Sequence, residues 1–205
     1  YGTPLIMDIL EAYGLRGVFF AEMCASAVVG DAPLAEAYQE IRARGHDVQL
    51  HLHPVFHYYA GLQHGRIAPS EVPSPIDDIG PQSLADQLGL IEEGVSIFER
   101  LLGKRPTAFR AGNYAASDAT LAALDKLGIR YDSSFNAAYL GTSCLISAPR
   151  SINSPWEAGS LWEVPVTVFT TGAGRLRGMK PLEISAVSFL EIRKVLEQAE
   201  RLGMG

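Results

Sequence analysis

The sequence is short of cysteine, of long apolar runs and of positive charge. Cys24 and Cys144 are its two cysteines; they are far apart and the sequence alone does not pair them, so we expect a structural thiol at each. No run approaches the roughly 18 apolar residues that span a bilayer, so these residues predict no membrane span. The formal net charge is −6, and without a basic stripe nucleic acid is not expected as a partner.

A glycine-rich phosphate loop is also missing, since no Gly-x-Gly-x-x-Gly follows any predicted strand. An enzyme of the dinucleotide-binding class is therefore not favoured. What is present is the composition of an ordinary globular domain, with 47% hydrophobic and 20% charged residues in a chain of 205. A sugar or another small molecule fits this acidic chain better as a ligand.

Segments with the patterns of strands and helices alternate along the chain, without a linker or a repeat. This order predicts one α/β domain over residues 1–205 with parallel strands, either a barrel or a doubly wound sheet. Residues 54–81 read as a long polar loop and residues 136–160 as irregular. The expected helices cover residues 4–13, 33–44, 83–102, 117–127 and 184–202, and the expected strands cover residues 17–23, 47–52, 107–110, 129–132 and 161–169.

The segment Gly45-His-Asp-Val-Gln-Leu-His-Leu-His-Pro54 carries the strongest functional pattern. Strand alternation puts His51 and His53 on the same face, about 6–7 Å apart at the backbone, so that both imidazoles can converge on one ion. Zinc and similar divalent ions favour neutral imidazole. The pattern therefore predicts a metal site, while its alternative is a pair of histidines that only bond to neighbouring backbone.

Other polar residues stand at the ends of predicted strands. Arg110 follows one strand and Asp132 ends another, and the carboxyl ends of parallel strands carry the chemistry in such folds. This shared position indicates a common site with the two histidines. The structural alternatives are an ordinary ion pair for Arg110 and a helix cap for Asp132.

These motifs resemble the polysaccharide deacetylase family, also called the NodB-homology or carbohydrate esterase 4 group. The resemblance covers nearly the whole chain and rests on Gly45–Pro54, on Phe109-Arg-Ala-Gly-Asn-Tyr114 and on Tyr131-Asp-Ser-Ser134. It also includes Tyr13-Gly-Leu-Arg-Gly-Val-Phe-Phe20, which is similar to the "YGVKATFF" of the family. The combination of "QLHLHP" with "FRAG" resembles a subgroup that is associated with lipopolysaccharide biosynthesis.

The resemblance implies a deformed (β/α) barrel that binds a divalent metal, often zinc, through one Asp and two His. In the family the metal polarises an acetyl carbonyl and activates water, so the implied activity is removal of acetyl groups from an N- or O-acetylated sugar of a polysaccharide or glycolipid. The motif with paired aspartates would precede Tyr1, and the motif with the acid histidine would follow Gly205. We therefore expect a fragment that lacks the first and last strands and is inactive alone.

The resemblance also implies which histidines bind the metal. His51 matches the first metal histidine of the family, but Val55 occupies the position of the usual second one. His53 is expected to replace it, because it shares the strand face of His51, and His57 is the fallback, since it would need the loop to fold back.

Further roles follow from the later motifs. Arg110 matches the arginine that orients the catalytic base, although Ala111 and Gly112 stand where two prolines usually follow it. A backbone N–H near Asn113 is expected to donate to the oxyanion, and Asp132 matches a family aspartate.

Three aromatic residues are expected at the substrate. Tyr114 is a candidate to line the groove, and Trp156 and Trp162 are candidates to stack on sugar rings. For each of the three, ordinary packing in the core or in a loop is the alternative.

Two other classes of protein compete with the deacetylase reading. Amidohydrolases and the polymerase-and-histidinol-phosphatase group also use His-x-His on a strand, but they need later histidines, and none follows His64. A barrel that binds glycans without chemistry is favoured by Ala111-Gly112 and by the unusual histidine spacing. A Thr-Phe-Asp-Asp-like run upstream would favour the hydrolase over this binder.

Overall fold

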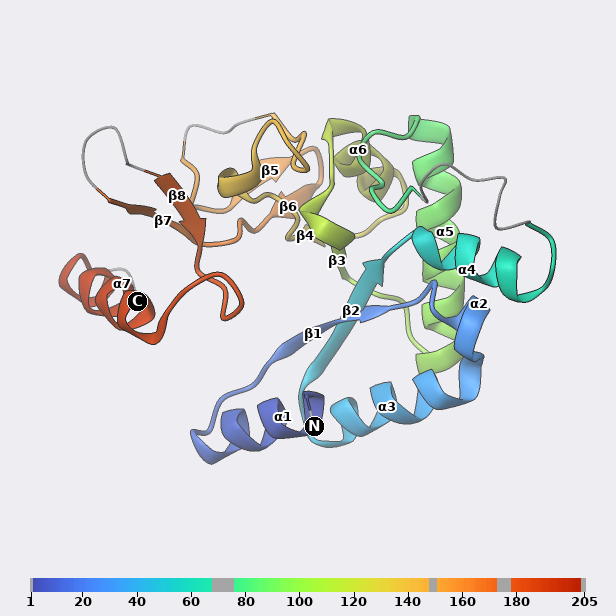
Figure 1. The fold of residues 1–205 in the computed structure, drawn as a ribbon, viewed down its shortest axis with the longest axis horizontal. Helices are drawn as coiled ribbons and strands as arrows, with labels where there is room; N and C mark the ends of the chain where they lie inside the picture. The colour runs from blue at the N-terminus through green and yellow to red at the C-terminus, as the bar shows by residue number, and fades with distance from the viewer. Residues whose placement is uncertain (1, 68–75, 148–150, 173–177, 204–205) are drawn as a thin grey trace.

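A six-stranded, mostly parallel sheet organises the computed structural model, which describes residues 2–67, 76–147, 151–172 and 178–203 (Figure 1). The strand order is β1-β2-β3-β4-β6-β5, and only β5 runs antiparallel to its neighbour. The strands of this sheet are β1 (Val18–Glu22), β2 (Asp47–Leu52), β3 (Ala108–Ala111), β4 (Tyr131–Asp132), β5 (Trp156–Ala158) and β6 (Leu161–Glu163). The strands β7 (Val168–Thr171) and β8 (Gly178–Pro181) form a separate antiparallel hairpin.

The helices that connect the parallel strands bury one face of the sheet. On β2, Val48, Leu50 and Leu52 face these helices and are fully buried. A Cβ atom at Gly94 of α5 (Leu84–Leu102) would lie 2.6 Å from the Leu52 side chain, so this glycine permits close packing of helix on strand. The helices are α1 (Thr3–Ala12), α2 (Ser26–Val29), α3 (Asp31–Ala43), α4 (Val55–Gln63), α5 (Leu84–Leu102), α6 (Asp118–Lys126) and α7 (Phe189–Arg201).

The predicted alternation of strands and helices with parallel pairing is confirmed, and the boundaries of α5 show why the local signals worked. The Ser83 hydroxyl accepts a hydrogen bond from the backbone N–H of Asp86, and Gly103 ends the helix with a φ of 66°. Both are standard helix-end devices, because they satisfy backbone groups that the helix leaves unpaired.

Four expectations about the elements were wrong. The segment 54–81 is not all loop, because Pro54 adopts a helical backbone and starts α4. The single strand expected at 161–169 is two strands, since Pro165 between β6 and β7 has no N–H for a ladder. The irregular segment 136–160 contains β5, which pairs with β6. The last helix starts after Ser188, whose hydroxyl forms a capping box with Glu191, and not at 184.

The other face of the sheet is accessible. Alternate side chains of the strands line a cavity of about 460 Å³ on this face, among them Phe20, Gln49, Arg110 and Tyr131.

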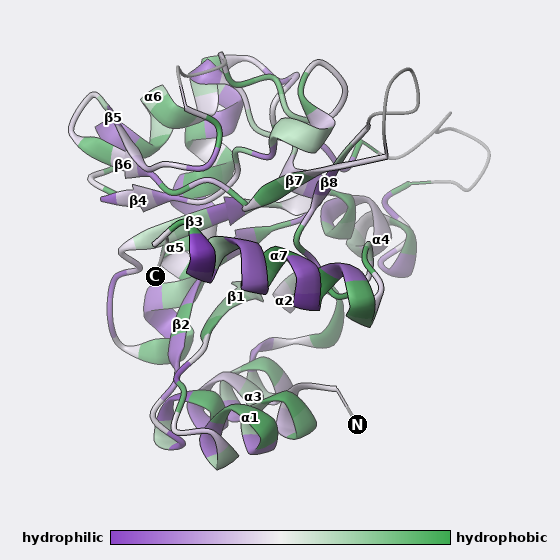
Figure 2. Cartoon of the chain, turned by 90° about the vertical axis from the view of Figure 1, so that its left-hand side faces the viewer, coloured by the Kyte–Doolittle hydropathy of each residue, from purple (hydrophilic) through white to green (hydrophobic). Residues whose placement is uncertain are grey.

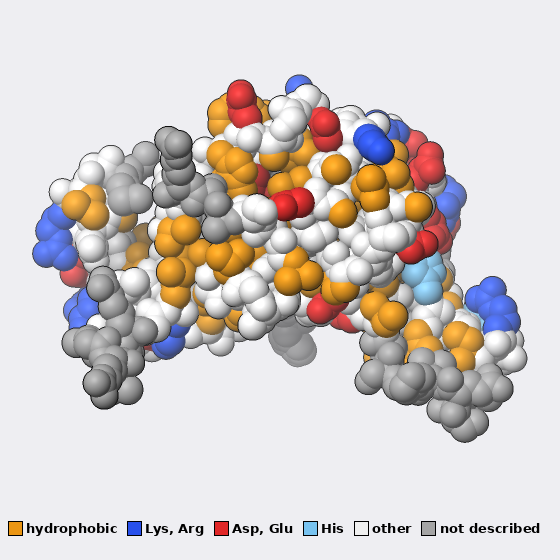
Figure 3. Space-filling view, turned by 90° about the horizontal axis from the view of Figure 1, so that it is seen from above, with side chains coloured by type: hydrophobic (Ala, Val, Ile, Leu, Met, Phe, Trp, Pro, Cys, Tyr) orange, Lys and Arg blue, Asp and Glu red, His pale blue; other side chains and the backbone are white. Residues whose placement is uncertain are grey.

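Figure 2 shows α1 and α3 together at one end of the molecule and α7 apart from them. Seen from above, apolar side chains cover much of the surface, with acidic side chains scattered among them (Figure 3).

Candidate metal centre

Three side chains converge at the carboxyl ends of β1 and β2. Glu22 is the last residue of β1, His51 lies on β2, and His53 is the first residue after β2. The parallel register pairs Glu22 with His51, and the two-residue strand period brings His53 to the same face. One nitrogen or oxygen atom of each residue lies within 4.8 Å of the others, and no other such group of three occurs among the described residues. The expected histidine pair therefore comes together.

The ring of His51 is neutral and has one free nitrogen. Its Nδ1 lies 2.6 Å from the backbone oxygen of Arg110, and because a carbonyl oxygen only accepts, Nδ1 carries the proton. Burial lowers the pKa of His51 to about 4, so the ring is uncharged at neutral pH. Its Nε2 is then unprotonated, and a neutral imidazole with such a nitrogen is the form that binds a metal.

The ring of His53 also has a hydrogen-bond partner at Nδ1, here a carboxylate. Its Nδ1 lies 2.8 Å from Oδ2 of Asp77, and the two imidazoles meet edge to face with 4.9 Å between their centroids. A Cβ atom at Gly112 would lie 2.6 Å from the His53 ring, so this glycine keeps space for it.

Glu22 completes a donor set of one carboxylate and two imidazoles. Its Oε1 accepts from the backbone N–H of Cys24 at 2.6 Å, whereas its buried Oε2 has no hydrogen-bond partner among the described residues. Burial raises the pKa of Glu22 to about 7. An unpaired buried carboxylate oxygen is costly unless a cation or a proton satisfies it. The residues fit a divalent ion such as zinc, which takes three protein ligands of these types and leaves a position for water.

The sequence analysis missed Glu22 and Asp77. Glu22 had a usable signal, since it is a charged residue at the end of an otherwise apolar strand, with the same alternation as Val18 and Phe20. Asp77 had none, because it lies in a segment without periodicity and reaches His53 across 24 residues of chain.

Arg110 is the register partner of His51 on β3. Its Nε donates to the backbone oxygen of Ser133 at 2.8 Å and one terminal nitrogen donates to the Ser133 hydroxyl at 2.6 Å. The guanidinium lies 4.4 Å above the ring of Phe20, and burial lowers its pKa. No carboxylate within the described residues forms an ion pair with it, so its role in orienting a base stays a prediction.

The turn after β3 holds Asn113 and Tyr114 in an unusual conformation. Their φ angles are 55° and 54°, in the left-handed region that non-glycine residues rarely adopt. The Asn113 side chain donates to Asp77 at 2.9 Å and to Asp78 at 3.0 Å, and the Tyr114 hydroxyl donates to Glu183 at 3.3 Å. The predicted backbone role of Asn113 stays a prediction.

Four of the predicted residues border one cavity. It has a volume of about 460 Å³ and shares Val18, Phe20 and Arg110 with the cavity on the open sheet face. A ligand in it would contact one of the metal donors, His51, and the later motifs. Its wall includes His51, Arg110, Asn113, Tyr114 and Glu183.

Asp132 lies in a buried carboxyl pair and not beside the three metal donors. It is the register partner of Glu163, and it accepts from the Ser134 hydroxyl at 2.7 Å. Burial raises the pKa of both groups, and the neighbouring Asp132 raises that of Glu163 further. Glu163 is therefore protonated at neutral pH. The structure leaves the catalytic assignment of Asp132 as a prediction.

The two tryptophans and the fallback histidine have separate surroundings. Trp156 is half-buried and packs edge to face on Phe135 at 5.0 Å, whereas Trp162 is 42% exposed. His57 lies on α4, where its Nε2 is 3.6 Å from a carboxylate oxygen of Glu93, outside the group of metal donors.

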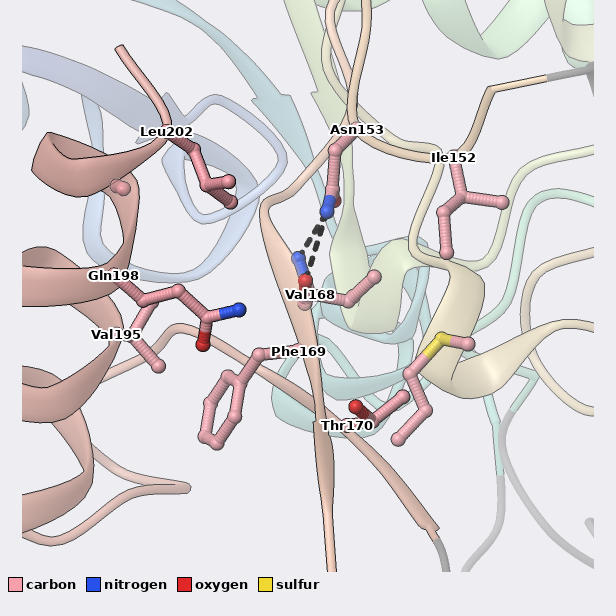
Figure 4. Close-up of a pocket in the computed structure, with 10 residues that line it drawn as sticks. Ile152, Asn153, Val168, Phe169, Thr170, Val195, Gln198 and Leu202 are labelled. Atoms are coloured by element: carbon pink, nitrogen blue, oxygen red, sulfur yellow. Dashed lines mark hydrogen bonds between the residues drawn. The ribbon is translucent and has the colours of Figure 1, made fainter. Parts of the chain in front are cut away.

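Another cavity, of about 310 Å³, lies between the β7–β8 hairpin and α7 (Figure 4). Asn153 fixes one wall through two hydrogen bonds of 2.9 Å with the backbone of Val168. Among the described residues no ionisable side chain lines this cavity, and those that do line it offer no acid, base or strong metal ligand. The cavity at the strand ends is the better candidate site.

The comparisons with known proteins support the fold. A crystal structure described as that of a "putative polysaccharide deacetylase from Mycobacterium smegmatis" is similar, with a TM-score of 0.51 and 18% sequence identity. The match covers 80% of this chain and 45% of that one, so this chain spans less than half of the neighbour's length. No protein-family model and no curated protein matches the sequence. None of the described helices has the length and apolar character needed to cross a bilayer.

Proposed function

We propose that this chain is part of a metal-dependent hydrolase that removes acetyl groups from an N- or O-acetylated sugar of a polysaccharide or glycolipid. The observation that carries the proposal is the donor set Glu22, His51 and His53, with a free Nε2 expected on each ring and an unpaired oxygen on the carboxylate. The fold similarity to a structure described as a deacetylase supports the same class.

The proposed metal is Zn²⁺, which when bound supplies Lewis-acid polarisation of the acyl carbonyl and an activated water. The residues of this chain would hold the metal and orient the acyl group. His51 is kept neutral by burial, and the guanidinium of Arg110 borders the cavity beside it, where it favours negative charge that develops on the acyl oxygen. The exposed ring of Trp162, next to Tyr131 in the sheet register, offers a flat apolar face to a sugar.

The finer parts of the proposal follow the family resemblance. In this proposal the sheet is the described part of a deformed (β/α) barrel. Arg110 would orient the catalytic base, although no carboxylate among the described residues forms an ion pair with it.

A second candidate function is a glycan-binding barrel without catalysis. The observation that favours it is the same Arg110, which is anchored by Ser133 and two aromatic rings and has no ion-pair partner among the described residues. A binding protein would need only the cavity and its aromatic wall.

The experiment that separates these functions combines metal content and acetate release. The longest available form of the protein, with and without His51→Ala, is dialysed, assayed for zinc and incubated with N-acetylated and O-acetylated oligosaccharides. Stoichiometric zinc and acetate release, both lost in the variant, support the hydrolase. Zinc or glycan binding without acetate release favours the binder, and absence of zinc in the unmodified protein overturns the metal centre.

A further inference from the structure

We propose that Asp77 is a positioning residue of the metal centre: its carboxylate fixes the tautomer and the ring orientation of His53 so that Nε2 faces the metal. This inference rests on the proposed function, because it assumes that His53 is a ligand. It concerns a residue that the sequence analysis did not single out, from a segment remote from the metal donors in the sequence.

The contacts of Asp77 fix its carboxylate from three directions. Oδ2 lies 2.8 Å from Nδ1 of His53 and accepts from the side-chain amide of Asn113 at 2.9 Å. Oδ1 accepts from the backbone N–H of Val55 at 3.4 Å. The donors come from the end of β2, the start of α4 and the turn after β3. A carboxylate held by three separate segments has little freedom to rotate.

His53 needs such a partner more than His51 does. The β2 ladder holds His51 on both sides, and a backbone oxygen accepts from its ring. His53 stands beyond the last ladder residue, Leu52, and directly before Pro54, so no strand pairing sets its ring. A carboxylate that accepts from Nδ1–H selects the tautomer with a free Nε2 and makes that nitrogen a stronger donor to a metal.

The residues around His53 also restrict the orientation of its ring. The Gly112 backbone lies against one side of the ring and leaves no space for a Cβ atom. Next to it, Asn113 adopts the left-handed φ of 55°, a conformation that is unfavourable for a non-glycine residue. That conformation accompanies the hydrogen bond from its amide to Asp77. The strained turn therefore supports the carboxylate that supports the ring.

Asp78 provides a matched control. It is the next residue, it has the same side chain, and it accepts from the same Asn113 amide at 3.0 Å. Among the described residues its carboxylate makes no contact with His53. A difference between the two aspartates therefore reports on the bond to the ring and not on the local charge.

The test measures zinc affinity by competition with a chromogenic chelator in the unmodified protein, Asp77→Asn and Asp78→Asn. We expect Asp77→Asn to weaken zinc binding by about 10–100-fold, the usual effect of removing the partner of a metal-bound histidine. Asp78→Asn is expected to change it less than about threefold, because it leaves that bond intact. Equal affinities of the two variants would overturn the proposal.

A second measurement keeps the proposal testable if Asp77→Asn does not fold. In the metal-free unmodified protein, ¹⁵N NMR of the imidazoles reports which nitrogen of His53 carries the proton. We expect the proton on Nδ1, and a proton on Nε2 overturns the role of Asp77. If the unmodified protein binds no zinc, the proposed function fails first. If it binds zinc and only the comparison of the two aspartates fails, the proposed function stands without this inference.

Discussion

Two places in the same sheet bring ionisable side chains together on neighbouring parallel strands, and they satisfy them differently. At the ends of β1 and β2, Glu22 meets two imidazoles and keeps an unpaired oxygen. At the ends of β4 and β6, Asp132 meets only another carboxyl group, Glu163, and burial raises the pKa of both. A group of three donors is suited to a cation, whereas two buried carboxyl groups are satisfied by sharing a proton.

The difference shows that proximity of acidic groups does not by itself make a functional site. In the carboxyl pair, Asp132 accepts from the Ser134 hydroxyl and Glu163 accepts from the backbone N–H of Phe135, while Oε2 of Glu163 has no hydrogen-bond partner among the described residues and is satisfied by the retained proton. The metal centre is open. Nδ1 of His51 lies against the backbone oxygen of Arg110 and Nδ1 of His53 against the carboxylate of Asp77, which leaves Nε2 of each ring for a metal.

The largest expected effect is the loss of the metal centre when one of its ligands is removed. His51→Ala removes a ligand that no neighbour can replace, and we expect loss of stoichiometric zinc, at least about 100-fold in affinity. Elemental analysis after dialysis measures it. His57→Ala is the control, since His57 faces Glu93, and it should keep the metal. Zinc loss in both variants would make His57, on α4, the second ligand.

The closed pair is tested through stability. Because Glu163 is protonated, Glu163→Gln should change the free energy of unfolding little, while Glu163→Ala leaves a cavity and an uncompensated Asp132 and should cost about 3 kcal/mol. Urea unfolding followed by circular dichroism measures both. If Gln is as harmful as Ala, Glu163 is charged in the folded protein.

The pH dependence of the stability of the metal-free protein tests the environment of Glu22. The pKa of Glu22 is raised to about 7 from 4.5 in the unfolded chain, so the folded protein binds this proton more tightly. The stability from this group is complete below about pH 4.5 and is lost as the pH rises through 7, in total about 2 kcal/mol after allowance for solvent screening. In Glu22→Gln this loss should be absent, which urea unfolding from pH 5 to pH 8 measures. Parallel curves for the two proteins would contradict the raised pKa.

The smallest expected effect concerns the sugar. Trp162→Ala should weaken binding of an oligosaccharide by about 1 kcal/mol without lowering the melting temperature, because its ring is exposed. Trp156→Ala should instead lower the melting temperature, since it removes a ring packed on Phe135. Calorimetric titration and thermal unfolding measure the two quantities. Unchanged sugar affinity in Trp162→Ala would exclude that ring from the binding surface.

Local patterns in the sequence predicted much of the fold. The cap at Ser83 and the stop at Gly103 bounded α5, and the apolar alternation of β2 put His51 and His53 on one face. The hairpin of β5 and β6 and the break at Pro165 were missed. Strands of three residues carry too short a pattern to read, and a proline between two apolar runs looks like part of a single run.

The sequence by itself determined the pair of imidazoles and the alternation of strands and helices, because both depend on backbone periods of a few residues. Only the tertiary structure decided the rest of the site. Glu22 joins His51 because the packing of the sheet sets β1 against β2 in one register, and Asp77 reaches His53 because α4 and the turn after β3 fold around it. These contacts join distant segments, and no local period encodes them.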